Sequence, residues 1–301
     1  MQWAELCVRL QKRYAEAVAE FMIEQGSSNG VVEEKSPEDS NSAVLKAYIR
    51  NDLDRDGYVS RVADYIAQLF AASGDEGARP DIEINVIADE DWNKKWKSFF
   101  QPLPITDRIV IKPSWKEYHP RGGEVIIELD PGMAFGTGTH PSTSMCLKAI
   151  DELDRLLASA RGLKLLDVGT GSGILAIAAA KLGFAEVVAI DVDQVAVRVA
   201  QKNAELNGVA GRVALSNTPL RQLDGEYPVV VANILPHVLT YFKQQLIERL
   251  APGGFLILSG IILEKAADVI EAFEAALELH KEFREENWSC LVFRKPSAPH
   301  L

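Results

Sequence analysis

Alternation of two apolar patterns constrains the second half of this chain more than any other feature. From residue 163 onward, short apolar runs typical of buried strands alternate with segments whose apolar residues recur at helical spacing. This order predicts an α/β fold, a doubly wound and mostly parallel sheet with helices on both faces. Such sheets bind ligands beyond the carboxyl ends of their strands. The predicted strands cover 163–169, 186–193, 212–217, 227–235, 253–261, 280–286 and 289–294, and the predicted helices 174–182, 195–208, 238–250 and 264–277.

The first 90 residues follow a different order: strand, helix, strand, strand, helix, strand. That order predicts a smaller ferredoxin-like α+β domain at 1–90, with strands at 2–10, 30–34, 43–49 and 82–88 and helices at 12–25 and 58–72. Four aromatic side chains then share one helical face: Trp92, Trp96, Phe99 and Phe100. Because Pro102 stops that pattern, we predict a linker helix at 91–102 and a second domain at 103–301.

Acidic side chains outnumber basic ones. The 301 residues include 43 Asp and Glu against 32 Lys and Arg, a formal net charge of -11. Residues 1–90 alone hold 18 acidic and 9 basic side chains, and the difference, 9 minus 18, is -9. We therefore expect no direct binding to nucleic acid or membranes. The acidic N-terminal domain is either a solubilising surface or a docking face for a basic protein.

Neither disulfides nor a metal site is expected. The three cysteines, Cys7, Cys146 and Cys290, are odd in number, far apart and free of any C-x-x-C pair. His140 and His237 have no second ligand at metal-binding spacing. The chain has no apolar signal core at its start and no apolar stretch near the roughly 18 residues of a membrane helix. We therefore expect a cytoplasmic protein.

A glycine-rich turn follows the predicted strand 163–169. Glycines recur at every second position, Gly169, Gly171 and Gly173, and Asp167 precedes them. Glycines at a strand-to-helix turn let a ligand approach the backbone amides. The dinucleotide pattern G-x-G-x-x-G would need a glycine at position 174, which is Ile174, so the turn disfavours nicotinamide and flavin. Asp167 suits a ligand with an ammonium group, such as S-adenosylmethionine.

Two further polar residues follow neighbouring predicted strands. Asp191 ends the strand 186–193, 22 residues beyond Gly169, the spacing from which a carboxylate accepts both hydroxyls of an adenosine ribose. Asp193 is a nearby competitor for this role, and a simple turn or cap residue is the structural alternative. Asn233 follows the apolar strand 227–235 and carries an amide that can orient an amine nucleophile, unless it merely closes the strand.

The segment from Leu129 to Met145 is dense in glycine and threonine and precedes a predicted helix. It is not a phosphate-binding P-loop of the form G-x-x-x-x-G-K-[ST], because the first lysine after it is Lys148. The segment is either a loop that folds over a cofactor or a flexible loop that leads into a helix cap.

Together these motifs resemble the PrmA family, the methyltransferases of large-subunit ribosomal protein L11. The run LDPGMAFGTGTHPSTSMCL is similar to that family's signature, and DVGTGSGILAIAAAKLG, AIDVDQVAVRVAQKNAELNGV, VVVANIL and GGFLILSGI match in order. The resemblance spans residues 92–296. It implies a class I, Rossmann-like S-adenosylmethionine-dependent methyltransferase with a seven-stranded sheet. It also implies that the N-terminal domain recognises the ribosomal protein.

The resemblance also implies site residues. Thr143, Gly169, Asp191 and Asn233 are implied as cofactor contacts, and Asn233 is our candidate for the catalytic group that orients the amine. Many relatives have a cysteine at the position of Thr170, a difference that backbone binding should tolerate. The implied reaction is transfer of methyl groups from S-adenosylmethionine to lysine side chains of ribosomal protein L11, with its N-terminal amine as a further target. We expect the enzyme to be a monomer.

Three alternatives stay open at this point. A class I methyltransferase that acts on another protein or on a small amine would share every cofactor motif. A nicotinamide oxidoreductase is disfavoured by Ile174. A binding module without catalysis, assembled on ribosomes, is disfavoured by the intact motifs.

Overall fold

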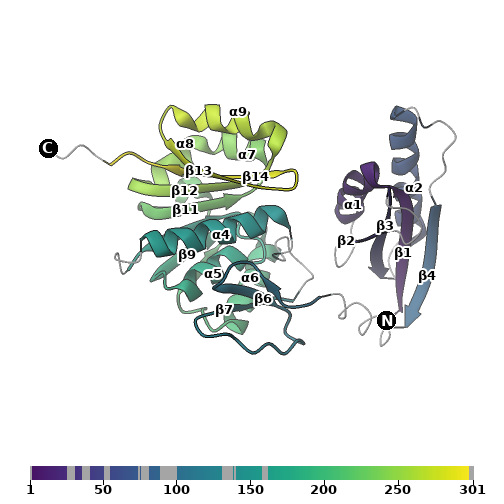
Figure 1. Cartoon of the computed structure of the whole chain (residues 1–301), viewed down its shortest axis with the longest axis horizontal. Coiled ribbons are helices and arrows are strands. Elements are labelled where there is room, and N and C mark those ends of the chain that lie inside the picture. Colours follow the sequence, from purple (N-terminus) through teal and green to yellow (C-terminus); the bar gives the residue numbers. More distant parts are fainter. Residues whose placement is uncertain are drawn as a thin grey trace. The chain divides into compact units, whose positions relative to one another are not determined.

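The computed structural model describes residues 2–25, 31–35, 41–50, 55–73, 75, 81–88, 100–130, 138, 140–157 and 162–297. The chain divides into two compact units, Met1–Phe100 and Gln101–Leu301 (Figure 1). Of the predicted linker helix, residues 91–99 lie outside the described part of the chain. Part of the predicted cofactor loop also lies outside it, at 131–137 and 139.

The N-terminal unit has the predicted ferredoxin-like order. Its elements are β1 (Gln2–Gln11), α1 (Ala15–Glu24), β2 (Val31–Lys35), β3 (Ser42–Arg50), α2 (Arg55–Ala72) and β4 (Asp81–Ala88), with a short 3-10 turn at Lys12–Tyr14. The strands form one antiparallel sheet in the order β2-β3-β1-β4. The predicted small α+β fold is therefore confirmed.

Both helices of this unit cover one face of its sheet (Figure 1). Alternate residues of a strand point to opposite faces, so Leu6 and Val8 of β1 meet Val18 of α1 and Ile66 of α2. All four side chains are fully buried. Each such aliphatic side chain contributes roughly 1.5–3 kcal/mol on burial, which makes this face the core of the unit.

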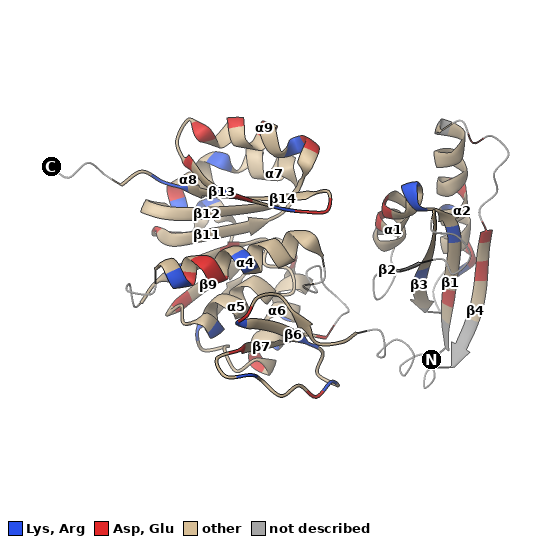
Figure 2. Cartoon of the chain, viewed as in Figure 1, with Lys and Arg blue, Asp and Glu red and all other residues tan. Residues whose placement is uncertain are grey.

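The opposite face of the same sheet carries polar groups. The Tyr48 hydroxyl donates a hydrogen bond of 2.7 Å to Oε2 of buried Glu5. Arg9 of β1 pairs across the strands with Asp81 (3.3 Å) and Glu83 (2.9 Å) of β4. Figure 2 shows the acidic positions on β1 and β4. This face therefore combines a buried polar pair, Glu5 and Tyr48, with exposed charged groups at Arg9, Asp81 and Glu83.

The second unit is built on the predicted doubly wound sheet. Seven strands pair in the order β10-β9-β8-β11-β12-β14-β13, and the pairs from β10 to β12 are parallel, whereas β14 is antiparallel to both neighbours. The strands are β8 (Lys164–Val168), β9 (Glu186–Ile190), β10 (Val213–Ser216), β11 (Tyr227–Asn233), β12 (Leu250–Ile262), β13 (Glu278–Glu285) and β14 (Trp288–Arg294). The predicted fold class, including seven strands, is confirmed.

Helices cover both faces of this sheet, as Figure 1 shows. On β11, Val229 and Val231 point into the core that includes α4 (Pro141–Leu156) and α5 (Ile174–Leu182). The alternate side chains Val230 and Ala232 point into the core of the other face. The remaining helices are α6 (Gln194–Leu206), α7 (Pro236–Tyr241), α8 (Lys243–Arg249) and α9 (Leu263–Glu274). Burial on both faces explains why the strands are continuous apolar runs in the sequence.

One feature of this unit differs from the sequence prediction. The single helix expected at 238–250 is two short helices, α7 and α8, joined at Phe242. Hydrogen bonds from Phe242 N–H to Val238 and from Leu246 N–H to Phe242 continue across the joint, so the apolar periodicity does not reveal it. The sequence also has two strand-like runs at 107–113 and 123–129, and both contain strands, β6 (Ile109–Lys112) and β7 (Val125–Glu128), which with β5 (Leu103–Pro104) form a separate small sheet.

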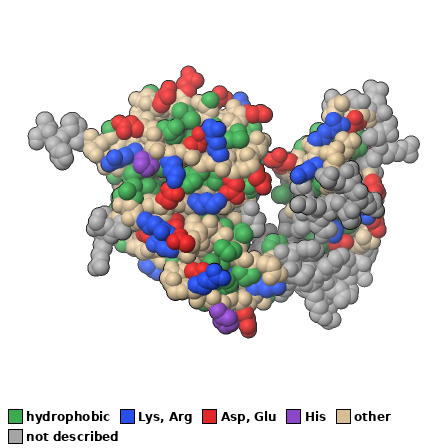
Figure 3. Space-filling view, in the orientation of Figure 1, with side chains coloured by type: hydrophobic (Ala, Val, Ile, Leu, Met, Phe, Trp, Pro, Cys, Tyr) green, Lys and Arg blue, Asp and Glu red, His purple; other side chains and the backbone are tan. Residues whose placement is uncertain are grey.

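Surface charge is mixed on the second unit. On its face in Figure 3, Lys and Arg side chains are interspersed with Asp and Glu side chains. Within the described ranges, none of the helices has the length and apolar character needed to span a membrane.

Candidate functional site

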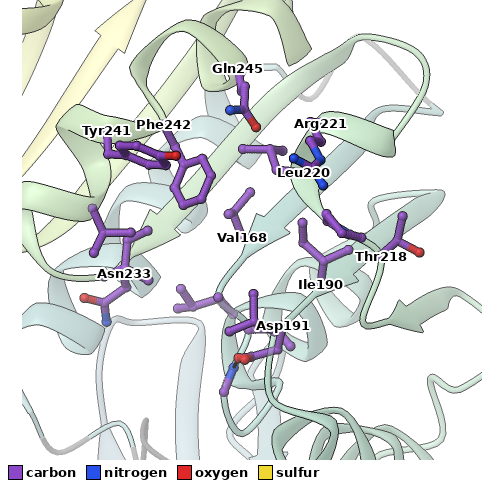
Figure 4. Close-up of a pocket in the computed structure, with 18 of the residues that line it drawn as sticks. Val168, Ile190, Asp191, Thr218, Leu220, Arg221, Asn233, Tyr241, Phe242 and Gln245 are labelled. Carbon is purple, nitrogen blue, oxygen red and sulfur yellow. Dashed lines mark hydrogen bonds between the residues drawn. The ribbon is translucent and has the colours of Figure 1, made fainter.

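A cavity of about 520 Å³ opens at the carboxyl edge of the large sheet. It gathers residues from the ends of β8, β9, β10 and β11 and from α4, α5, α7 and α8 (Figure 4). The lining includes five predicted site residues, Thr143, Gly169, Gly171, Asp191 and Asn233. Asp167 and Gly173 lie next to the lining residues in sequence but do not line the cavity. The position agrees with the rule for doubly wound sheets.

The glycine turn brings backbone close to other groups where side chains would not fit. Gly169 has a φ of +76°, and a Cβ there would lie 2.5 Å from Cγ2 of Ile234. Gly173 has a φ of +83°, and a Cβ there would lie 3.0 Å from Cβ of Ala200 in α6. Gly169 therefore shapes the cavity wall, whereas Gly173 permits close packing between α5 and α6.

Asp167 lies fully buried behind this turn. The Thr170 hydroxyl donates a hydrogen bond of 2.7 Å to Oδ2 of Asp167, and Oδ1 has no partner among the described residues. Burial raises the pKa of Asp167 to about 7, and the hydrogen bond from Thr170 opposes that rise. A half-satisfied buried carboxyl of this kind gains from a cationic group placed near the turn. Thr170 thus has a specific contact in this site.

Asp191 follows β9 directly and ties the turn to its neighbouring strand. Its Oδ2 accepts a hydrogen bond from the Gly171 N–H (2.9 Å), and its Oδ1 accepts one from the Asp193 N–H (3.0 Å). Each carboxylate oxygen keeps a further lone pair that can accept from a ligand hydroxyl. The competing Asp193 instead caps α6, because its Oδ1 accepts from the Val195 N–H at 2.7 Å.

Asn233 ends β11 and contacts α4. Its Nδ2 donates a hydrogen bond of 3.3 Å to Oγ1 of Thr143, and its Oδ1 is buried without a partner among the described residues. Gly260 of β12 leaves room for this segment: a Cβ there would lie 2.6 Å from the Ile234 carbonyl oxygen and 3.2 Å from Oδ1 of Asn233. One amide acceptor is thus held in the cavity by groups from three elements.

A histidine, His140, stabilises the start of α4, a role that the sequence analysis did not assign to it. His140 is the N-cap residue, and its Nδ1 accepts a hydrogen bond of 3.2 Å from the Ser142 N–H. Burial lowers the pKa of His140, which favours the neutral ring that this contact requires. Within the part of the chain that the structure describes, no group of three or more His, Cys, Asp or Glu is placed to hold a metal ion.

Several cavity residues were not identified from the sequence. Thr218 and Leu220 follow β10, and their place after a strand of the same parallel sheet was the available signal. Phe242 and Gln245 come from the joint between α7 and α8 and from α8. They had no sequence signal, because a helix prediction alone does not say which polar side chain faces inward.

The glycine turn, the carboxylate on the next strand and the doubly wound sheet define a class I methyltransferase that uses S-adenosylmethionine. The site suits that molecule. The oxygens of Asp191 have lone pairs that can receive ribose hydroxyls. Because Gly169 has no side chain, a ligand can come close to the backbone there.

Comparison with known proteins identifies the family. The chain matches the family model of ribosomal protein L11 methyltransferase (PrmA) over residues 2–296. A ribosomal protein L11 methyltransferase from Citrifermentans bemidjiense is 45% identical over 307 residues, which covers 98% of each chain. One from Geobacter sulfurreducens is 42% identical over 304 residues, 97% of this chain and 98% of the relative. This chain therefore belongs to the PrmA family of ribosomal protein L11 methyltransferases.

A solved structure agrees with the family assignment. The crystal structure of a ribosomal protein L11 methylase from Lactobacillus delbrueckii subsp. bulgaricus is 34% identical, with a TM-score of 0.60. It covers 65% of this chain and 100% of the solved one. The family predicted from the motifs is thus confirmed, and the family match extends into the N-terminal unit, beyond the segment that carried the resemblance.

Proposed function

We propose that this enzyme transfers methyl groups from S-adenosylmethionine to lysine side-chain amines of ribosomal protein L11, with its N-terminal amine as a further target. The observation that carries the proposal is Asn233, a residue that lines the cavity and whose amide Oδ1 is buried without a partner among the described residues. An amide oxygen in that place accepts a hydrogen from an amine but cannot remove a proton from it.

The residues around the cavity divide the work of holding the cofactor. Asp191 accepts from the ribose hydroxyls while it keeps the turn in place through the Gly171 N–H. Asp167, directly or through a water molecule, balances the ammonium of the methionine part. Thr143 holds the amide of Asn233 through its hydroxyl. When bound, S-adenosylmethionine supplies a methyl group on a sulfonium, which is already a good leaving group.

Asn233 orients the acceptor amine. A free lysine amine has a pKa near 10.4 and is mostly protonated at neutral pH, so the site must favour its neutral form. Removal of the amine from water favours that form, and the oxygen of Asn233 then accepts one of its remaining hydrogens. Alignment of a neutral nitrogen with the methyl carbon is the main requirement of an in-line displacement. No general base is part of this proposal.

The N-terminal unit is proposed to recognise the protein substrate. Its net charge of -9 over residues 1–90 suits a basic partner, and its sheet exposes charged groups on the face opposite the helices. We propose that the enzyme acts as a monomer. The cytoplasm is the compartment in which this activity is proposed.

The test uses ribosomal protein L11 that has not been enzymatically methylated. The purified enzyme is incubated with it and with labelled S-adenosylmethionine, and mass spectrometry locates the product. We expect label on lysine amines with the wild type and strongly reduced label with Asn233→Ala. Label on another protein of the large subunit in place of L11 would support a different substrate. Label on a carboxylate or an amide of L11 would exclude amine methylation.

A further inference from the structure

One side of the cavity carries a polar group that the proposed function does not use. Gln245 lies on α8, and Figure 4 shows its amide directed into the cavity, on the side where Phe242 and Arg221 also lie. Its Oε1 is buried and has no hydrogen-bond partner among the described residues. A buried acceptor without a partner is unfavourable, so a ligand that supplies an N–H donor there binds more tightly.

Three unpaired acceptor oxygens belong to this region of the described chain: Oδ1 of Asp167, Oδ1 of Asn233 and Oε1 of Gln245. The proposed function assigns the cofactor ammonium to Asp167 and the acceptor amine to Asn233. S-adenosylmethionine carries one further N–H donor group that is still without a partner, the exocyclic amine of its adenine. Gln245 is the remaining buried acceptor that lines the same cavity.

We propose that the side-chain amide of Gln245 recognises the adenine of S-adenosylmethionine. Its Oε1 accepts from the exocyclic amine and its Nε2 donates to the neighbouring ring nitrogen. This two-point pairing between glutamine and adenine is the one that proteins use to read adenine in DNA. The inference rests on the proposed placement of the cofactor, and it assigns Gln245 as a specificity-determining residue.

The surroundings of Gln245 fit a purine. Ile190, Leu220 and Phe242 line the cavity and supply apolar surface for the faces of a flat ring. The other polar groups nearby are poorer acceptors for an amine. Arg221 carries only donors, and Oγ1 of Thr218 already accepts a hydrogen bond of 3.0 Å from the Ser216 hydroxyl. Gln245 is therefore the best-placed side chain to distinguish an amino group at the edge of the purine.

A structural role within α8 is the competing explanation. Arg249 lies one helical turn after Gln245, and its Nε is also buried without a partner among the described residues. A small change of rotamer that joined these two side chains would satisfy both atoms inside the helix. In that case Gln245 would contribute to stability and would not affect the choice of ligand.

The experiment measures binding by calorimetry with two ligands. One is S-adenosylhomocysteine, and the other is its purine analogue, in which hydrogen replaces the exocyclic amine. We expect the wild type to prefer the adenine ligand by roughly 10- to 100-fold, the range expected for a two-point pair of about 1–3 kcal/mol. Gln245→Met should bind the adenine ligand more weakly by a similar factor and lose the preference. Gln245→Glu retains an acceptor oxygen and should keep the preference.

Gln244→Met is the matched control. Gln244 is exposed on the same helix, and its Nε2 donates to Oε1 of Glu248 at 2.9 Å. This variant should bind both ligands as the wild type does. A wild-type preference that persists in Gln245→Met, with or without a lower melting temperature, would overturn the inference and assign Gln245 to α8 stability. Failure of the wild type to bind S-adenosylhomocysteine at all would instead refute the cofactor placement beneath both proposals.

Discussion

The two units of this chain arrange the ends of their strands in opposite ways. In the parallel sheet, β8, β9 and β11 end at one edge, so Gly169, Asp191 and Asn233 meet in a single cavity. In the N-terminal sheet all neighbours are antiparallel, so adjacent strands end at opposite edges and each edge receives the ends of only two strands, which are not neighbours. Its polar groups lie across a face instead, as the pairs of Arg9 with Asp81 and Glu83 show.

This difference assigns a different role to each unit. A concave site for a small molecule requires several groups that converge, which the parallel unit supplies. Exposed charged groups on a sheet face suit a basic protein partner, and the antiparallel unit has such groups on β1 and β4. Changes at the carboxyl edge of the parallel sheet should therefore alter cofactor binding and turnover, and changes on the face of the antiparallel sheet should alter only the affinity for the protein substrate.

The largest effect is expected at Asp191. Asp191→Ala removes acceptors for the ribose hydroxyls and the bond that holds the Gly171 N–H. A loss of about 3 kcal/mol in affinity, close to 100-fold in Kd for S-adenosylhomocysteine, is expected by calorimetry. Asp193→Ala is the control: it loses the cap of α6 and about 1 kcal/mol of stability, but it should keep the affinity. Equal affinity in both variants would remove Asp191 from the cofactor site.

The next effect is expected at the acceptor-amine end of the cavity. Asn233→Ala should lower kcat by about 100-fold, a loss typical for one preorganised polar group, and change Kd for S-adenosylhomocysteine much less. Thr143→Val, which removes the hydroxyl that receives the Asn233 amide, should show a smaller loss of kcat. Single-turnover kinetics separate these effects from binding. Full turnover by Asn233→Ala would mean that other groups orient the amine.

The buried Asp167 predicts a pH effect on stability. Because its pKa is about 7 in the folded protein, against 3.8 ordinarily, the folded state holds a proton that the unfolded state releases. On this account the free energy of unfolding falls as pH rises from about 4 to about 7. Asp167→Asn removes that contribution. The melting temperature of the variant minus that of the wild type should therefore increase as pH rises across this range, and it should stay constant at higher pH. A constant difference in melting temperature between the two proteins from pH 4 to 8 would show that ionisation of Asp167 does not destabilise the folded state.

The same carboxyl should make cofactor binding pH-dependent. A bound ammonium favours the charged form of Asp167, so the wild type should bind S-adenosylhomocysteine more weakly as pH falls below about 7. Asp167→Asn should bind more weakly than the wild type above pH 7 and lack this pH dependence. Calorimetry across the range checks both statements.

The smallest effect is expected on the N-terminal unit. The double change Asp81→Lys and Glu83→Lys reverses two exposed charges on β4 and should raise KM for the protein substrate by about fivefold, since exposed pairs contribute about 1 kcal/mol. The effect should shrink at high salt. Glu264→Lys with Asp268→Lys on α9 is the matched control in the other unit. An equal rise in KM in both variants would show that net charge matters and the N-terminal face does not.

The sequence predicts best those features that depend on residues close together in the chain. In the parallel unit, the burial of both sheet faces produced continuous apolar runs, and the turn glycines follow β8 within a few residues. The seven strands and the family were therefore predictable. The helix expected at 238–250 was only partly right, because the joint at Phe242 keeps helical hydrogen bonds on both sides. The roles of all the predicted site residues remain predictions: Thr143, Asp167, Gly169, Gly171, Gly173, Asp191 and Asn233.

The sequence by itself determined the α/β fold, the ferredoxin-like order of the first unit, the glycine turn and the acidic residue on the next strand, because each depends on neighbours close in the chain. Only the tertiary structure showed that Thr143 holds the amide of Asn233 and that Gly260 leaves space beside it. Only the tertiary structure showed that Gln245 lines the cavity. These contacts join residues from separate elements, and their geometry depends on how helices pack against the sheet, which no local pattern records.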